Sequence, residues 1–173
     1  ELRFVLSLPR EKTMMVAREI ISRQKQKYGL LPPLELCLGQ TREMMTRASA
    51  GIAASGTVTV EAAILDLPLV VTYRLNWLSW LLGKWLVKLP WISIANLVCN
   101  ACVYEEYLQD QATPENLSRA LLQILPDGSR RQEVLTGLQR TRELLGGDVD
   151  VADRVARRIL LDTFESLPEG TVI

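Results

Sequence analysis

Short apolar runs alternate with stretches of helical spacing along the first hundred residues of this chain, and this alternation constrains the fold more than any other feature. Pro9 and Pro68 interrupt the pattern, and Gly29 stands where it can cap the end of the first helical stretch. Strands that alternate with helices imply right-handed crossovers and a parallel sheet covered on both faces. We therefore predict an α/β fold with a Rossmann-like parallel sheet, followed by C-terminal helices.

The apolar runs and the helical stretches give the predicted elements. We expect strands at Leu2–Leu8, Leu34–Leu38, Ala50–Ala54, Leu69–Tyr73 and Trp91–Ile94. We expect helices between them at Glu11–Tyr28, Thr41–Arg47, Val58–Leu65 and Trp77–Val87. After about residue 103 the pattern changes, and we expect one or two helical turns at Glu105–Gln109 and helices at Thr113–Leu125, Ser129–Leu145 and Val151–Phe164. The predicted division is a sheet domain over residues 1–125 and a helical extension over residues 126–173.

Charge and residue types exclude several classes of function. The 173 residues carry 20 Lys and Arg and 20 Asp and Glu, so the formal net charge is zero. This argues against nucleic acid as the main partner, because phosphate binding needs a basic surface. The sequence has no histidine, which removes a Ser-His-Asp triad and a histidine metal site. Cys99 and Cys102 form a lone C-x-x-C, which is a weak metal or redox signal and more often two core or loop residues.

The first residues indicate a fragment. Glu1 opens directly onto a strand-like run without a Met. We expect a longer parent polypeptide, with a first strand and further sequence before Glu1. Any function inferred from these residues then belongs to that parent.

One junction carries the chemistry of the predicted sheet. The apolar run at Ala50–Ala54 ends in Ser55, Gly56 and Thr57, and a helical pattern begins at once. Ligands of such sheets bind outside the carboxyl ends of the strands, where free N–H groups at a helix start favour an anion such as a diphosphate. Glu61 lies four residues past Thr57 on the same side of the helix, where it can accept hydrogen bonds from sugar hydroxyls. The plainer alternative is a helix cap at Ser55 or Thr57 and a solvated Glu61.

The junction also resembles a known family in its ordered motifs. The pattern S-G-T-x-T-x-E-A followed by P-[ML]-V-V-x-Y-[RK] is present as Ser55, Gly56, Thr57, Thr59, Glu61, Ala62, Pro68, Leu69, Val70, Val71, Tyr73 and Arg74. The likeness continues from Trp80 to Lys88 and ends in E-x-L-Q-D-x-A-T-P-E-N-L, which spans residues 106–117. The chain thereby resembles the lipid-A-disaccharide synthase family, whose members have the two-domain GT-B architecture.

This resemblance implies a function for the parent protein. A member of this family transfers 2,3-diacylglucosamine from its UDP carrier to 2,3-diacylglucosamine 1-phosphate, and it forms UDP and a β-1,6-linked disaccharide of lipid A. The chain would be the UDP-sugar-binding half, with a UDP site at Ser55, Gly56, Thr57, Glu61, Arg74 and Asn96. The resemblance implies no metal and no cofactor. The catalytic base would lie in the N-terminal domain, so we assign none to these residues.

Two departures from the family pattern affect the edge of this site. Ala95 replaces a Pro of L-P-N-L-L-A-G-R-E, and Asn100, Ala101 and Cys102 stand where Gly, Arg and Glu are expected. The loss of the Arg and the Glu leaves open whether this edge of the nucleotide site is built in the same way.

Residues 76–91 hold all four tryptophans of the chain. Trp77, Trp80 and Trp85 with Lys84 and Lys88 form the pattern of a helix that lies in the headgroup layer of a membrane. The alternative is a buried helix or one covered by another domain. With the family resemblance, this pattern implies a cytoplasmic protein that is peripheral at the inner membrane of a Gram-negative-type bacterium.

The last third of the chain is rich in arginine and in balancing acids. The plainer interpretation is a solvated helix surface. The resemblance implies that the final helices pack on the N-terminal domain or exchange in a homodimer. Two other functions stay open: another GT-B UDP-sugar enzyme, such as a peptidoglycan N-acetylglucosaminyltransferase or a UDP-N-acetylglucosamine 2-epimerase, and a non-catalytic membrane-surface or dimerisation module.

Overall fold

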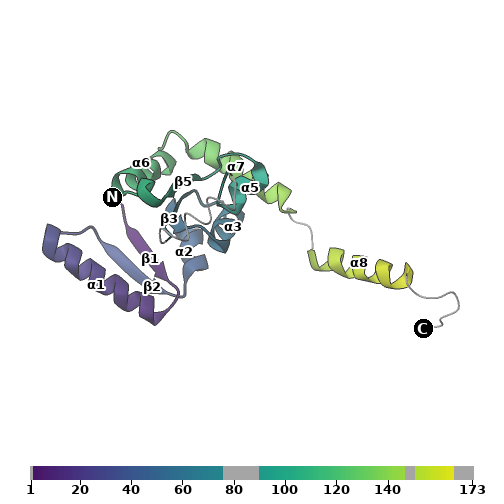
Figure 1. Cartoon of the computed structure of the whole chain (residues 1–173), viewed down its shortest axis with the longest axis horizontal. Helices are drawn as coiled ribbons and strands as arrows, with labels where there is room; N and C mark the ends of the chain where they lie inside the picture. Colours follow the sequence, from purple (N-terminus) through teal and green to yellow (C-terminus); the bar gives the residue numbers. More distant parts are fainter. Residues whose placement is uncertain (1, 76–89, 147–150, 166–173) are drawn as a thin grey trace.

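The structure is a computed structural model of the chain, and it describes residues 2–75, 90–146 and 151–165 (Figure 1). The first half contains β1 (Phe4–Leu8), α1 (Glu11–Tyr28), β2 (Leu34–Leu38), α2 (Thr41–Arg47), β3 (Gly51–Ala54), α3 (Thr57–Ile64) and β4 (Leu69–Tyr73). The second half contains α5 (Ile94–Cys99), β5 (Glu105–Leu108), a 3-10 turn η1 (Gln109–Gln111), α6 (Pro114–Ile124), α7 (Arg131–Leu144) and α8 (Val151–Glu165). The α/β fold with parallel strands and flanking helices is confirmed.

The described strands form two parallel sheets rather than one. β1 pairs with β2, with Phe4 opposite Leu34. The second sheet has the order β3–β4–β5, with Gly51 opposite Leu69 and Val70 opposite Glu105. Because the pairings are parallel, the carboxyl ends of β3, β4 and β5 meet at one edge of their sheet.

The hydrophobic core lies around the three-stranded sheet. The exposed fraction of β4 is 3% at Leu69, 1% at Val70 and 0% at Val71. Helices α3, α5, α6 and α7 contribute to the same cluster, as does Met45 from α2. Leu138 of α7 is fully buried in it, so α7 belongs to this core.

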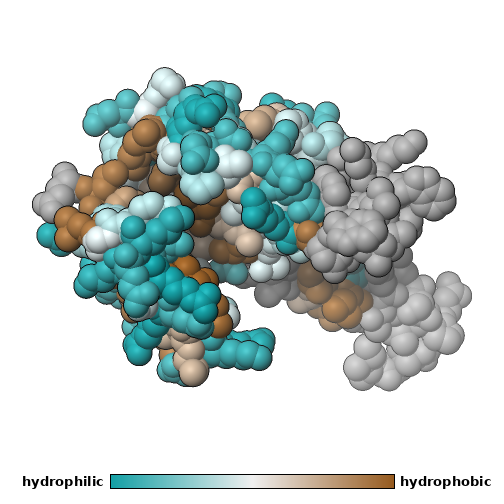
Figure 2. Space-filling model, turned by 60° about the vertical axis from the view of Figure 1, so that its left-hand side comes forward, coloured by the Kyte–Doolittle hydropathy of each residue, from teal (hydrophilic) through white to brown (hydrophobic). Residues whose placement is uncertain are grey.

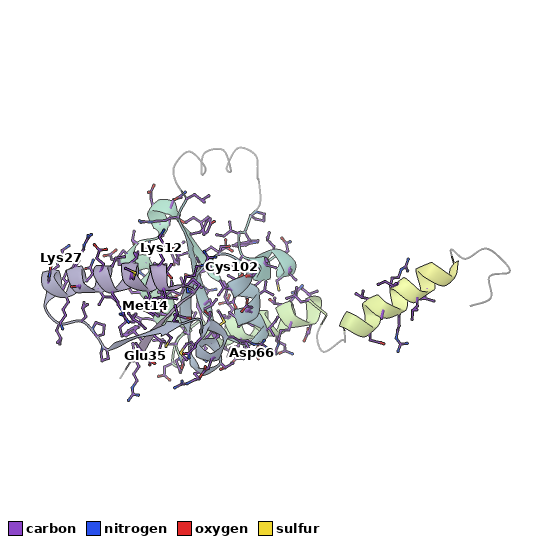
Figure 3. All side chains as sticks on the ribbon, turned by 90° about the horizontal axis from the view of Figure 1, so that it is seen from below. Lys12, Met14, Lys27, Glu35, Asp66 and Cys102 are labelled. Carbon is purple, nitrogen blue, oxygen red and sulfur yellow. The ribbon has the colours of Figure 1, made fainter. Side chains whose placement is uncertain are left out.

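The two-stranded sheet is covered differently. α1 packs on it through Met14 and Ala17, the two buried residues of this helix. Figure 3 labels Lys12 and Lys27, which mark the first and last turns of α1. Most side chains of β1 and β2 stay at least partly exposed, so this sheet lacks the second layer that the three-stranded sheet has.

Two sequence-based predictions are wrong. Residues 91–93, predicted as part of a strand, form an irregular segment that leads into α5, with bends at Ile92 and Ser93. The N–H groups of Ile92 and Ser93 donate to the carboxylate of Glu106 instead of to a strand, at 2.8 Å each. The predicted helical turns after Glu105 are β5, which completes the sheet beside β4. Adjacent glutamates favour a solvated helix locally, whereas here both carboxylates have partners distant in sequence.

The other predicted elements agree with the structure to within two residues, where it describes them. The predicted helix Trp77–Val87 lies outside the described residues, and so do Trp77, Trp80, Lys84, Trp85 and Lys88. The division at residues 125 and 126 stays a prediction. Figure 1 shows α8 apart from the other elements, and Val155, Ile159, Leu160 and Leu161 on it are more than half exposed.

Candidate functional site

The turn after β3 is fastened to the neighbouring strand at the carboxyl edge of the sheet. The N–H of Ser55 donates to the carbonyl of Thr72 at 3.3 Å, so the turn extends the pairing of β3 with β4. Arg74 follows β4, and Gln109 follows β5. Parallel pairing therefore brings three segments that are far apart in sequence to one edge, as predicted for this fold.

Gly56 sets the conformation of the turn. Its φ is +154°, which side chains rarely adopt, and it is the N-cap of α3. A Cβ added at Gly56 would meet no atom within 4 Å, so the space beside this residue is open. The N–H groups at the start of a helix have no partner within the helix. The turn thus presents polar backbone and the positive end of the α3 dipole to open space.

The hydroxyl of Ser55 has a structural partner. Its Oγ donates to the carbonyl of Ile92 at 3.0 Å and ties the turn to the segment before α5. The oxygen keeps its capacity to accept, but its proton is engaged in this structure. Thr59, for which the sequence indicates no role, is fully buried, and its Oγ1 donates to the carbonyl of Gly56 at 2.8 Å. Thr59 therefore holds Gly56 in place from inside the helix.

Thr57 and Glu61 both lie on the exposed side of α3, one turn apart, while Ala62 and Ala63 face the core. Among the described residues Glu61 makes no side-chain hydrogen bond or ion pair. Its carboxylate is therefore available to a ligand on the side of α3 that also carries Thr57.

Arg74 joins the ends of two strands. Its Nε donates to the carbonyl of Gln109 at 3.2 Å and its Nη2 donates to the carbonyl of Ala112 at 3.0 Å. The N–H of Leu75 donates to Oε1 of Gln109 at 3.3 Å, which closes the same contact. A guanidinium has five N–H donors, so these bonds fix its position and leave donors for an anion. Arg74 is exposed at the predicted edge.

Asn96 is buried and fully engaged. Its exposed fraction is 0%, and its Oδ1 accepts from the N–H of Tyr104 at 2.8 Å. Its two amide protons go to the carbonyl of Tyr104 at 2.8 Å and to Oε1 of Glu106 at 2.9 Å. In this structure the side chain positions β5 and Glu106 and does not line an open surface. Direct contact of Asn96 with a nucleotide stays a prediction.

Glu106 is the residue whose role the sequence does not indicate. Its two carboxylate oxygens accept from the N–H groups of Ile92 and Ser93 and from Asn96, so one side chain holds the start of α5 against β5. Glu106 opens the E-x-L-Q motif of residues 106–109, and this motif is its one signal in the sequence. Beside it a cavity of about 310 Å³ is lined by Trp91, Glu106, Leu108 and Gln111, among others.

A charged cluster fixes the outer edge of β5. Arg130, just before α7, bonds to the carboxylate of Glu105 and through its Nε to Glu133 at 3.0 Å. The pKa of Glu133 is lowered by the hydrogen bond from Arg130 and by its charge. Burial, together with the hydrogen bond to Glu105, raises the pKa of Tyr107 to about 12. These groups hold β5 to α7 and lie away from the turn at Gly56.

Two of the departures from the family pattern, Ala95 and Asn100, have local explanations. Asn100 caps α5 with φ 47° and ψ 41°, the left-handed conformation for which Gly and Asn are the usual residues. Ala95 is in the first turn of α5, where a Pro is also tolerated. Neither exchange requires a different backbone at this edge.

The three cysteines are free. Buried Cys99 contacts Oγ1 of Thr141 at 3.2 Å, whereas Cys102 is exposed and its Sγ donates to the carbonyl of Tyr104 at 3.6 Å. Within residues 2–75, 90–146 and 151–165 there is no group of three or more Cys, Asp or Glu side chains placed to hold a metal ion. In the same residues no helix has the length and apolar content needed to cross a membrane.

Comparison with known proteins gives one consistent result. The sequence profile of the lipid-A-disaccharide synthetase family matches residues 6–159. The lipid-A-disaccharide synthase of Solibacter usitatus is 40% identical over 127 residues, which is 73% of this chain and 33% of that protein. The enzyme of the same name from Gloeothece citriformis is 39% identical over 83% of this chain and 37% of that protein.

The match extends toward the end of the chain in a further relative. The lipid-A-disaccharide synthase of Myxococcus xanthus is 32% identical over 91% of this chain and 39% of its own length. The chain thus spans about a third of the length of the curated relatives that it matches. The profile covers the described elements from the second half of β1 through most of α8, so this chain belongs to the lipid-A-disaccharide synthase family.

Proposed function

We propose that this chain is the UDP-sugar-binding half of a lipid-A-disaccharide synthase. The whole protein is an inverting hexosyltransferase that moves 2,3-diacylglucosamine from UDP to 2,3-diacylglucosamine 1-phosphate, with release of UDP. The observation that carries this proposal is the open turn at Gly56, which starts α3 at the carboxyl edge of a parallel sheet. Membership of the family supports the same assignment.

The roles of the site residues follow from their positions. Backbone N–H groups at Gly56 and Thr57, with the α3 dipole, bind the diphosphate and stabilise the charge that develops on UDP as it leaves. Glu61 accepts hydrogen bonds from the ribose hydroxyls. Ser55 and Arg74 hold the turn and the strand ends in register, and Arg74 adds positive charge to the diphosphate side. Asn96 acts through Glu106, whose carboxylate accepts from the N–H of Ile92, and the carbonyl of Ile92 in turn accepts from the hydroxyl of Ser55.

The proposal requires other parts of the protein for catalysis. The proton acceptor for the attacking sugar hydroxyl lies in the remainder of the longer protein, so the isolated chain binds donor without turnover. We propose neither a metal nor a cofactor, because helix N–H groups and the guanidinium of Arg74 supply the positive charge. The whole protein acts at the cytoplasmic face of the inner membrane, through residues Trp77, Trp80, Trp85, Lys84 and Lys88, and a homodimer through the C-terminal helices is part of the same proposal.

Calorimetric titration of the chain with UDP tests the site. We expect Glu61→Ala to weaken binding tenfold or more, which corresponds to about 1.4 kcal/mol. Gly56→Ala should also weaken binding, because alanine rarely adopts the backbone conformation at φ +154°. A steric clash would not explain this loss, since the added Cβ meets no atom within 4 Å. Glu19→Ala, on the exposed surface of α1, is the matched control for the loss of one carboxylate.

The two outcomes separate clearly. Weakening by Glu61→Ala with no effect of Glu19→Ala supports a nucleotide site on α3. Equal affinities in the unsubstituted chain and in all three variants would place UDP elsewhere and overturn the assignment. Activity of the full-length parent with acylated UDP-glucosamine then tests the donor and acceptor.

A further inference from the structure

The turn after β5 has a strained residue at the carboxyl edge of the three-stranded sheet. Gln109 follows the last residue of β5 and begins η1, and its φ is 50°. A residue with a side chain is uncommon in this left-handed conformation, and such residues gather at functional sites. Gln109 also closes the E-x-L-Q motif of residues 106–109. Its conformation is explained by the group that the turn holds.

The turn directs two carbonyl groups to one guanidinium. The carbonyl of Gln109 accepts from Nε of Arg74 at 3.2 Å, and the carbonyl of Ala112 accepts from Nη2 of Arg74 at 3.0 Å. The N–H of Ala112 also donates to the carbonyl of Gln109 at 3.1 Å, which closes the turn. The dihedral angles of Gln109 set the direction of its carbonyl, so the left-handed conformation brings this group to Arg74.

One edge of the Arg74 guanidinium stays open. Nε and Nη2 lie along the edge that faces the two carbonyl groups, and the remaining N–H groups of Nη1 and Nη2 form a second edge. Within the described part of the chain, Nη1 of Arg74 has no hydrogen-bond partner. Two N–H groups side by side match two oxygens of a phosphate.

The partners of Arg74 also leave its charge available. Figure 2 brings forward the side of the molecule that carries α1, and it shows hydrophilic and hydrophobic residues side by side there. Arg23 on α1 is paired with the carboxylate of Glu19, which neutralises its charge. Arg74 is bonded instead to two neutral carbonyl groups, and it forms no ion pair among the residues that the structure describes. Its positive charge can therefore act on an anion.

Arg74 lies at the same end of the sheet as the start of α3. It comes directly after β4, and the N–H of Ser55 donates to the carbonyl of Thr72, two residues before Arg74. An exposed arginine loses side-chain freedom when it binds an anion, and this loss weakens binding. Because the two carbonyl groups hold Arg74 before a ligand arrives, less freedom is lost on binding.

We propose that Gln109 is a positioning residue for diphosphate binding. Its left-handed turn holds the Nε–Nη2 edge of Arg74, so that the Nη1–Nη2 edge is presented to the diphosphate of a UDP-sugar. Gln109 itself does not touch the ligand. This inference rests on the proposed UDP site, and it adds which edge of Arg74 binds and which residue orients it.

Two substitutions of Gln109 separate its conformation from its side chain. Gln109→Val and Gln109→Gly both remove Oε1, which accepts from the N–H of Leu75 at 3.3 Å. Only valine disfavours the left-handed region, because a β-branched residue rarely adopts it whereas glycine adopts it readily. Asp66→Val is the matched control, since Asp66 has a similar φ of 53° but precedes β4, at the opposite end of the sheet. Gln109→Ala takes the place of Gln109→Val if urea unfolding shows that the valine variant is not folded.

Calorimetric titration of the chain with UDP is the main measurement. We expect Gln109→Val to weaken binding about fivefold or more, Gln109→Gly to restore it to within about twofold of the unsubstituted chain, and Asp66→Val to leave it unchanged. In a chain that already carries Arg74→Ala, Gln109→Val should add nothing, because it acts through the guanidinium. Uridine lacks the diphosphate, so its weaker binding, followed by NMR titration, should be the same in all these proteins.

The NMR signal of the Arg74 Nε–H reports on the turn without any ligand. We expect slow hydrogen exchange at this group in the unsubstituted chain and in Gln109→Gly, because the carbonyl of residue 109 accepts from it. Exchange should be fast in Gln109→Val. Equal exchange in all three proteins would mean that the conformation of Gln109 does not hold Arg74.

Three binding results would overturn the role of Gln109. One is an equal loss of UDP affinity in Gln109→Gly and Gln109→Val, which would assign the effect to the lost side chain. Another is an undiminished effect of Gln109→Val in the Arg74→Ala background. The third is a parallel loss of uridine binding, which would indicate general damage to the fold.

Glu61→Ala, titrated in parallel, separates this inference from the proposed site. If Glu61→Ala weakens UDP binding and Gln109→Val does not, the nucleotide site stands and the role of Gln109 falls. If neither substitution weakens binding, or if the unsubstituted chain binds no UDP, the proposed site and the anion-binding edge of Arg74 fall together.

Discussion

β1 and β4 are both five-residue parallel strands of largely apolar sequence, FVLSL and LVVTY, yet their environments differ. Val71 of β4 has an exposed fraction of 0%, whereas Val5 of β1 has 45%. Among the described strands, β4 has a neighbour on each side and helices against its sheet, whereas β1 has one paired neighbour. We therefore expect two strands of similar apolar composition to differ in how much they stabilise the fold, because the elements packed around each strand differ.

The largest expected effect contrasts the two sheets directly. Leu138→Ala in the core should lower the free energy of unfolding by about 2–5 kcal/mol, because it removes a fully buried side chain and leaves a cavity. Leu6→Ala, at a residue that is 37% exposed, should lower it by about 1 kcal/mol or less. Urea unfolding followed by circular dichroism measures both. Equal losses would mean that the β1–β2 sheet is as well packed as the core.

Asn96→Ala should have the next largest effect. It leaves the buried N–H of Tyr104 without a partner and removes one of the two donors to Oε1 of Glu106, which costs about 2–3 kcal/mol of unfolding free energy. Asn116→Ala removes an exposed hydrogen bond to the carbonyl of Gln111 and should cost about 1 kcal/mol or less. If the two variants unfold at the same urea concentration, Asn96 does not hold β5 and α5 together.

Alkaline pH should loosen the three-stranded sheet. Burial raises the pKa of Tyr104, and burial with the hydrogen bond to Glu105 raises that of Tyr107 to about 12. A raised pKa favours the neutral phenol in the folded state. The resulting stability is present below the unfolded value of 10.0 and is lost as pH rises through 10 toward 12.

This effect should be moderate, about 1 kcal/mol for Tyr107 once solvent screening is taken into account. Absorbance of ionised tyrosine, recorded together with circular dichroism during titration, follows it. We expect Tyr107→Phe to flatten the loss of stability above pH 10. Ionisation of all four tyrosines near pH 10 in an intact fold would contradict the buried position of Tyr104.

The smallest expected effect concerns a surface ion pair. Nη1 of Arg142 lies 2.6 Å from Oδ2 of Asp66, and the two side chains are 38% and 44% exposed. Asp66→Asn keeps a residue that tolerates the left-handed conformation at φ 53°, so it tests the charge alone. It should cost about 0.5 kcal/mol or less in unfolding experiments, with little further change at high salt.

The better shielded pair provides the contrast. The side chains of Arg130 and Glu105 are 21% and 24% exposed, and Glu105 also accepts from Tyr107. Glu105→Gln should therefore cost more than Asp66→Asn. The reverse order would mean that the outer edge of β5 does not depend on its charged cluster.

Local signals in the sequence determine much of the fold. They predict the helix at residues 11–28 to the residue, because Pro9 precedes the stretch and Gly29, at φ 78°, ends it. Runs and breakers in the sequence also predict the bounds of β2, α2 and β4. The turn at Gly56 is predicted as the site because a parallel sheet places strand ends at one edge, and the structure has the turn at that edge.

Only the tertiary structure decided the parts that depend on distant partners. Glu105–Leu108 becomes a strand because β4 pairs with it and because Arg130 and the start of α5 bind its two carboxylates. Asn96 turns inward for the same reason, toward Tyr104 and Glu106. The sequence thus determined where most elements begin and end, since caps and breakers act over a few residues. Contacts between residues distant in sequence decided which polar side chains are buried and how the described strands pair.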